Sequence, residues 1–253
     1  MSGSGSPATP DASPAEVPAG LVAAVVNLVG TGPVLLGAYT IAELTAVDAI
    51  VDFLEARPSD EVLAEAVRSL AARQLLAGGS DGEQVQVRGD LGIAVAFQQR
   101  ARMVLDARAT GTEPGEPWRI LLLPQPEQIC LMIRIDALGV HEIGLFKLDE
   151  ALGQLASWLP RGDRAEPDPA ADADGVLAAA QRSALVTVTR YSTEGSAETA
   201  GTSTDLVLAR RDGELHEFRR DPAAPDRLVA GPPERKDVRD TLEDLLTAGA
   251  RAA

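Results

Sequence analysis

The stretch WRILLLPQPEQICLMIRIDALGVHEIGLFKLDEALGQLASWL, residues 118–159, decides the fold. It contains three β-rich runs, Ile120–Leu123, Ile129–Ile135 and Val140–Phe146, separated by segments with Pro, Asp and Gly that favour turns. Leucines then follow at helical spacing, at positions 148, 152, 155 and 159, and the pattern stops at Pro160. The stretch therefore predicts three consecutive antiparallel strands followed by a packed helix, which is an α+β unit.

The C-terminal third of the chain resembles this unit, as expected of an internal repeat. Four residues of QRARMVLDAR match four of QRSALVTVTR at a constant offset of 82: Gln99, Arg100, Val104 and Arg108 against Gln181, Arg182, Val186 and Arg190. In the closing helices, Leu148, Leu152 and Leu155 correspond to Val238, Leu242 and Leu245 at an offset of 90. Strands expected in the second half are Leu185–Arg190, Leu206–Arg210, Leu215–Arg219 and Arg227–Ala230. The alternative is chance matching in a chain rich in Ala, Val and Arg.

The repeat predicts a pseudo-duplicated antiparallel or mixed sheet with flanking helices, in one α+β domain over residues 20–253. Its halves would be residues 20–160 and 176–253, joined by a Pro- and Asp-rich linker at 160–175. Within that linker, RGD at Arg161–Asp163 and the segment DPAADAD are interpreted as spacer rather than as an adhesion motif or a calcium loop. Residues 1–19, rich in Ser, Pro, Gly and Ala, are expected to be a disordered tail.

Composition excludes several classes of partner. The formal net charge of −15 and the aromatic content of 3% argue against nucleic-acid binding, which needs basic residues and favours stacking aromatics. The apolar segment Leu21–Leu36 is interrupted by Gly and Pro before it reaches membrane-spanning length, so we expect a short core helix followed by a turn and no membrane association. No basic leader precedes it, and the default location is the cytoplasm. The single cysteine, Cys130, is expected to be a small buried apolar residue rather than a nucleophile.

The N-terminal part predicts a helical unit. Thr40 and Glu43 form a capping box for a helix with an apolar stripe at Leu44, Val47, Val51 and Leu54. Ser59 caps a second helix, and Asp90 a third that runs to about Arg100. The apolar side of the second helix is expected to be Val62, Leu63, Val67 and Leu70, ending at Gly78 and Gly79, with a strand at Gln84–Arg88.

Helices followed by LAARQLLAGGSDGEQVQV outline a winged-helix-like unit. Its second helix offers Arg68, Arg73 and Gln74 for contact with DNA, but carries Asp60, Glu61 and Glu65 as well. We therefore favour a structural or protein-binding use of this unit, and keep an acidic winged-helix regulator as the alternative function.

Catalytic signatures are missing from the sequence. It has no Gly-x-Ser-x-Gly elbow, no Walker loop and no dinucleotide-binding glycine pattern, so we predict no enzymatic activity, no catalytic residues and no cofactor. His141 and His216 each precede a glutamate on a predicted strand, but no further ligand spacing accompanies them. We interpret both histidines as exposed strand positions and predict no metal site.

A partner-binding site is expected at the segment TEGSAETAGTST, Thr193–Thr204, which we interpret as a mobile loop between two strands. Tyr191 stands at its mouth, where an aromatic side chain can anchor a partner. The alternative is that Tyr191 packs on the sheet. The candidate residues are Tyr191, Thr193, Glu194, Gly195, Gly201 and Thr204.

The whole layout resembles the EspG family, the cytosolic chaperones of actinobacterial type VII (ESX) secretion. The resemblance covers most of residues 35–249. Its segments are LAARQLLAGGSDGEQVQV, MVLDARA, RILLLPQPEQICLMIRI, GVHEIGLF, LVLARRDGELHEFRRD and PPERKDVRDTLEDLL. It implies a single α+β domain with quasi-twofold halves, which binds secreted helical PE or PPE proteins and keeps them soluble for export. We therefore expect a non-enzymatic chaperone or adaptor with a protein partner.

Overall fold

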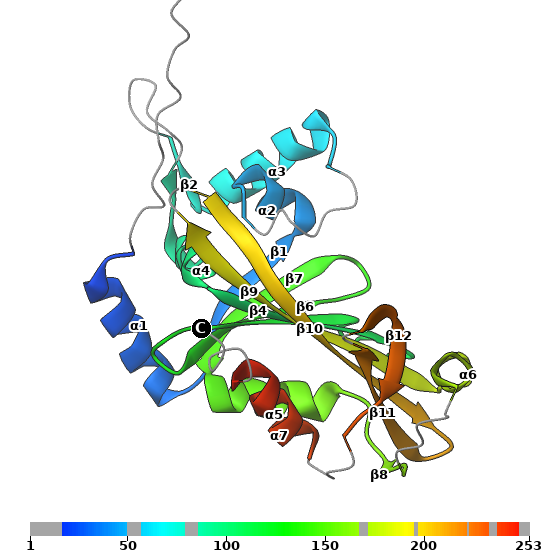
Figure 1. The fold of residues 1–253 in the computed structure, drawn as a ribbon. Coiled ribbons are helices and arrows are strands. Elements are labelled where there is room, and N and C mark those ends of the chain that lie inside the picture. The colour runs from blue at the N-terminus through cyan, green and yellow to red at the C-terminus, as the bar shows by residue number, and fades with distance from the viewer. Residues whose placement is uncertain are drawn as a thin grey trace, which may run out of the picture.

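The three β-rich runs form adjacent strands in the first half of a large sheet in the structure, a computed structural model that describes residues 17–49, 57–78, 86–166, 172–194, 197–221, 223–232 and 237–247 (Figure 1). They are β5 (Arg119–Pro124), β6 (Ile129–Ile135) and β7 (Val140–Lys147). The helix α5 (Leu148–Trp158) follows directly, and its Ala151, Leu152 and Leu155 are buried. The predicted α+β fold is confirmed.

The sheet has ten strands, in the order β1-β7-β6-β5-β4-β9-β10-β11-β12, with β8 paired to β11. The remaining strands are β1 (Val34–Thr40), β4 (Met103–Thr110), β8 (Asp163–Arg164), β9 (Arg182–Glu194), β10 (Ala197–Arg211), β11 (Glu214–Asp221) and β12 (Ala224–Ala230). The pair β8–β11 is parallel and the other pairs of this sheet are antiparallel. On either side of the central pair β4–β9, each half places its four strands in chain order from the centre outward, β4-β5-β6-β7 on one side and β9-β10-β11-β12 on the other.

The symmetric order fits two similar halves, but it corrects the match found in the sequence. Residues directly opposite in antiparallel strands share a face, and Leu105 of β4 lies opposite Val188 of β9. An offset of 82 would instead superpose Leu105 on Thr187, which lies opposite Asp106 and therefore on the other face. If the two halves are related by a twofold axis normal to the sheet, each side chain and its counterpart in the other half must lie on the same face. The offset of 82 places Leu105 and its counterpart Thr187 on opposite faces, so this alignment is out of register by one residue.

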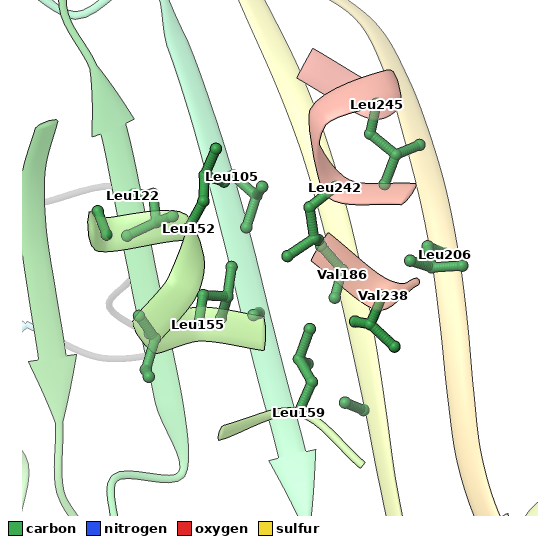
Figure 2. Close-up of a cluster of buried hydrophobic side chains, with 14 of the residues drawn as sticks. Leu105, Leu122, Leu152, Leu155, Leu159, Val186, Leu206, Val238, Leu242 and Leu245 are labelled. Carbon is green, nitrogen blue, oxygen red and sulfur yellow. The ribbon is translucent and has the colours of Figure 1, made fainter. Parts of the chain in front are cut away.

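One face of the sheet is covered by α5 and α7 (Val238–Thr247), and we call it the helix-covered face. Leucines of both helices meet side chains of β4, β5, β9 and β10 in one buried cluster (Figure 2). The cluster includes Leu105, Leu122, Leu152, Leu155, Leu159, Val186, Leu206, Val238, Leu242 and Leu245. The expected correspondence of Leu152 and Leu155 with Leu242 and Leu245 therefore holds at the level of burial.

The opposite face is covered unequally. Over the first half it carries the helices α1 (Ala19–Thr31), α2 (Ile41–Ala46), α3 (Asp60–Ala72) and α4 (Gly89–Arg100), with a second buried cluster beneath them. Over the second half, the described helix on this face is the short α6 (Ala173–Ala178). The middle of this face, along β4, β9 and β10, carries polar side chains, and we call it the open face.

The N-terminal unit follows the predicted caps but not every predicted boundary. The capping box of Thr40 and Glu43 is present, and the Ser59 side chain accepts a hydrogen bond from the Val62 amide. The helix α2 ends at Ala46, while Val51 and Leu54 lie outside the described residues. Asp90 is not a cap, because α4 already begins at Gly89 and has Asp90 in its first turn.

Three further features of this unit differ from the prediction: two element boundaries and the buried side of one helix. Val34–Leu36 belongs to β1 rather than to a helix and turn. Val62 and Val67 are exposed, because α3 packs through Leu63, Ala66 and Leu70, a narrower stripe than the one predicted. The helix ends at Ala72, ahead of a small hairpin of β2 (Leu76–Ala77) and β3 (Gln86–Val87), and the intervening residues 79–85 are outside the described part.

The segment 160–175, predicted as a linker, contains residues of two elements in its described part. Asp163 and Arg164 form β8, and α6 begins at Ala173. The Arg164 guanidinium donates to Glu217 Oε2 at 2.5 Å and to Thr241 Oγ1 at 3.3 Å, which connects β8 to β11 and α7. Within the described ranges, no helix is long and apolar enough to span a membrane.

Candidate functional surface

The segment predicted as a loop is a hairpin. β9 continues to Glu194 and β10 starts at Ala197, with Ala197 opposite Glu194 and Ala200 opposite Tyr191. The prediction of a mobile loop over Thr193–Thr204 is therefore wrong. The loop was predicted from the low hydrophobicity of the segment. Threonine, however, is common in β-strands as well as in loops, so low hydrophobicity does not distinguish the two.

The end of this hairpin reaches beyond both neighbouring strands. β4 pairs with β9 as far as Arg190, and the Tyr191 amide donates to Arg102 O at 2.9 Å. On the other side, the described pairing of β10 with β11 begins at Leu206. Within the described part of the chain, residues 192–194 of β9 are thus paired in the ladders only with β10, and residues 197–205 of β10 only with β9; we call these two segments the hairpin arm. Figure 1 shows this yellow end of the hairpin extending away from β11 and β12.

The structure brings most of the predicted site residues into one place. Thr193 and Glu194 lie near the end of β9, and Gly201 and Thr204 lie on β10, all within the hairpin arm. Tyr191 is half-buried at the base of the arm, and Thr204 is half-buried too. Gly195 lies outside the described residues. The site prediction itself stays a prediction, now attached to a strand arm instead of a loop.

At the base of the arm, the open face carries a row of polar side chains across adjacent strands. Asp106 of β4 lies opposite Thr187 of β9, and Thr187 lies opposite Asp205 of β10. Thr187 Oγ1 donates to Asp205 Oδ1 at 2.8 Å, and Arg220 Nε of β11 donates to Asp205 Oδ2 at 2.5 Å. Two residues further along the hairpin toward its turn, the hydroxyls of Thr189 and Ser203 are 3.1 Å apart.

At the β4 end of this row, two arginines bind the carboxylate of Asp106. Arg119 binds Asp106 through two hydrogen bonds of 2.8 and 2.7 Å, and Arg108 binds the same carboxylate at 3.1 and 2.9 Å. Side-chain exposure is only 5% for Arg119 but 52% for Arg108, so the second guanidinium faces solvent. Both aspartates of the row are therefore bound by arginine side chains, Asp106 by Arg119 and Arg108 and Asp205 by Arg220.

Sequence reasoning missed Asp106, Asp205 and their arginines. A signal was present, since in MVLDARA and TDLVLAR the charged residues alternate with the apolar residues that face the helices. Pairing partners, however, depend on strand register, and register cannot be seen within one strand.

The two histidines differ from their prediction as exposed positions. His141 is 3% exposed, opposite Ile135 and Tyr39 on the face under the N-terminal helices, and its Nδ1 lies 3.0 Å from Gly139 O. Burial lowers the pKa of His141 below its usual 6.5, and the nearby Arg119 charge acts in the same direction. His216 is half-buried and stacks on Phe218 with ring centroids 6.4 Å apart.

The cysteine is buried, and the described carboxylates are not grouped as metal ligands. Cys130 is fully buried, and burial raises the pKa of its thiol to about 12, which agrees with the prediction of an apolar role. Among the described side chains, no group of three or more His, Cys, Asp or Glu is placed to hold a metal ion.

The basic residues of the winged-helix-like unit are engaged within the protein. Arg73 donates to Glu43 Oε1 at 3.1 Å and lies over the Tyr39 ring, 4.9 Å from its centroid. Arg68 pairs with Glu65 at 2.6 Å. Burial alone would raise the pKa of Glu43, but hydrogen bonds from Thr40 and Ser69 and the charge of Arg73 lower it. The carboxylate therefore stays charged, and Arg73 is committed to it.

In comparisons with known proteins, no family model matches the chain and no curated protein matches it.

Proposed function

We propose that this protein is a non-enzymatic protein-binding chaperone or adaptor, and that it contacts its partner through the hairpin arm and the adjoining open face. In line with the resemblance to EspG, the proposed partner is a secreted helical protein of the PE or PPE type, bound in the cytoplasm. The observation that carries the proposal is the arm itself, a two-stranded extension whose outer edges have no neighbouring strand in the described part of the chain.

A protruding two-stranded arm is suited to contact with another protein. Unpaired strand edges present main-chain donors and acceptors that a partner can use, and folds without such a use tend to shorten or cover them. The arm sequence AETAGTSTD lacks the proline and lysine that protect edges elsewhere. Arg108 and Arg220, 52% and 47% exposed, add guanidinium groups of the kind enriched at protein interfaces.

The alternative function, an acidic winged-helix regulator, has weaker support. The hairpin β2–β3 does follow α3 as a wing would. However, Arg73 is tied to Glu43, Arg68 to Glu65, and the net charge of −15 opposes an approach to phosphates.

The test shortens the arm without unpairing its base. Tyr191 and Ala200 are opposite each other, so replacing residues 192–199 by Asn-Gly closes a two-residue hairpin at that pair. Deleting Gly195–Gly201 alone would instead leave the end of β9 without its partner. The shortened and the wild-type chains are tagged, expressed in the native host and purified, and co-purifying proteins are identified by mass spectrometry.

We expect a helical secreted protein to co-purify with the wild-type chain and to be lost with the shortened arm, while the melting temperature is unchanged. Leu138→Ala, in the exposed turn between β6 and β7, is the control and should retain the partner. Retention of the same partner by the shortened chain would place binding elsewhere. Retention of the wild-type chain on DNA at physiological salt would favour the regulator instead.

A further inference from the structure

β1 is the end strand of the ten-stranded sheet, and in the described part of the chain it pairs with β7 alone. The outer side of an end strand presents main-chain donors and acceptors to strands of other molecules, so such edges are commonly covered or interrupted. The start of β1 is interrupted, because its register shifts between Leu35 and Gly37 and the Leu36 carbonyl accepts a hydrogen bond from Tyr39 Oη at 2.8 Å. The regular part of the edge that needs a cover is therefore residues 38–40.

Side chains from α2 and from the end of α3 bind the main chain of this part of β1. Arg73, the C-cap residue of α3, donates from Nη2 to Ala38 O at 3.4 Å, and the Thr40 amide donates to Glu43 Oε2 at 2.9 Å. Main-chain groups two residues apart on a strand point to the same side. Because the other side of β1 is paired with β7, these two hydrogen bonds occupy its outer edge.

Glu43 links these bonds to α3. The residue is 5% exposed, and its second carboxylate oxygen, Oε1, accepts hydrogen bonds from Ser69 Oγ at 2.7 Å and from Arg73 Nη1 at 3.1 Å. Ser69 and Arg73 are four residues apart and therefore lie on the same side of the helix. One buried carboxylate thus joins the end of β1 to the C-terminal end of α3.

The apolar contact that α3 makes is small by comparison. Two of its 13 residues, Ala66 and Leu70, are buried, while Val62 and Val67 are exposed. A buried carboxylate that loses its charged partner keeps the cost of its desolvation without the compensating bond. The attachment of α3 therefore depends on the polar contacts of Glu43 as well as on Leu70.

We propose that Glu43 and Arg73 form a clamp that holds α3 against the outer edge of β1 and prevents this edge from pairing with a strand of another molecule. The clamp lies at a different edge of the sheet from the hairpin arm, and it does not depend on the proposed function. When the clamp is broken, α3 separates from β1 while the sheet stays folded, because the buried cluster beneath α5 and α7 contains no residue of α3.

The first experiment follows amide hydrogen exchange of the full-length chain by mass spectrometry. Arg73→Ala removes the donor to both Glu43 and Ala38, so peptides covering β1 and α3 should exchange about tenfold faster or more, as expected for a lost charge-assisted hydrogen bond. Peptides from β4 and β9 should be unchanged. Arg68→Ala is the matched control, because it removes the same charge from the same helix, and Arg68 is 70% exposed and paired with Glu65.

The second experiment measures self-association by analytical ultracentrifugation. At about 100 µM protein, Arg73→Ala should self-associate more strongly than the wild type and Arg68→Ala, because its β1 edge is free to pair. Arg73→Lys keeps the charge but lacks the forked donor groups that reach Glu43 and Ala38 together, so it should lie between the wild type and Arg73→Ala. Circular dichroism checks the fold of each variant.

Faster exchange confined to β1 and α3, together with stronger self-association of Arg73→Ala, would establish the clamp. Unchanged exchange of these peptides in Arg73→Ala, or an equal increase in Arg68→Ala, would overturn it. Faster exchange throughout the chain or a lost fold would overturn it as well, since Arg73 would then support the whole molecule. An unchanged association state of Arg73→Ala would show that α3 does not protect the edge of β1.

Discussion

His141 is a neutral imidazole inside a protein that otherwise carries many charges. It is 3% exposed, and burial lowers its pKa below 6.5. Below pH 6.5 the unfolded chain takes up a proton at this position while the folded chain does not, so the histidine reduces stability as the pH falls. Above pH 6.5 both states are neutral and the effect disappears.

The corresponding prediction is a pH-dependent difference between variants. Between pH 6.5 and 5, the free energy of unfolding of the wild type should fall relative to that of His141→Gln, by at most about 1.4 kcal/mol per pH unit. Urea unfolding at each pH measures it. Leu138→Ala, at an exposed position without a titratable group, is the control and should track the wild type, and parallel curves for His141→Gln and the wild type would contradict the assignment.

The thiol of Cys130 yields a second prediction for a single residue. Because the side chain is fully buried and its pKa is raised to about 12, the folded protein should not react with a thiol reagent such as DTNB at pH 8. One thiol per chain should react in guanidinium chloride. Rapid reaction of the native chain would show that β6 opens to solvent locally.

Single residues also show what sequence patterns can and cannot supply. The burial of Cys130 could be predicted, because its neighbours Ile129 and Leu131 leave it no exposed face in a central strand. The burial of His141 could not. Its neighbour Glu142 is exposed, and alternation along β7 puts His141 on the other face of the sheet. That face is buried only because Tyr39 and the N-terminal helices, about 100 residues earlier in the chain, pack over it.

Among the elements, α5 and α7 were predictable from their leucine spacing, and their packing carries a quantitative prediction. Leu155 and Leu245 are 0% and 2% exposed in the same cluster. Leu155→Ala and Leu245→Ala should each lower the free energy of unfolding by about 2–5 kcal/mol, measured by chemical denaturation. Leu138→Ala should change it by less than about 0.5 kcal/mol. A small effect at either buried leucine would contradict the packing.

The hairpin arm is the element that the sequence could not specify. Its strand boundaries come from pairing between Tyr191 and Ala200 and between Glu194 and Ala197, and neither side has the apolar alternation that marks a buried strand. The predicted residues were nevertheless neighbours in space, because a segment bounded by two strands returns on itself whether it is a loop or an arm. The polar row at Asp106 and Asp205 needed the register of three strands and was out of reach.

On the scale of the whole molecule, repetition of the strand pattern predicted a sheet in two similar halves. The order β7-β6-β5-β4 beside β9-β10-β11-β12 has this form. What the pattern could not supply was the join between β4 and β9, or the position of β1 beside β7, since both pair residues far apart in the chain. The alignment at an offset of 82 failed for the same reason. Which residues of β4 and β9 share a face of the sheet follows from the register in which these two strands pair.

The central pair β4–β9 has a consequence for synthesis of the chain. The pairs β4–β5, β5–β6 and β6–β7 close from local turns, so a nascent chain that has emerged as far as Trp158 can assemble them. Until residues 182–190 arrive, β4 is an open edge of eight residues, MVLDARAT, in which apolar and polar side chains alternate from Leu105 onward. During that interval another strand can pair with the exposed edge of β4 in the ribosome-bound half. Pairing with β9 covers this edge once β9 has been translated.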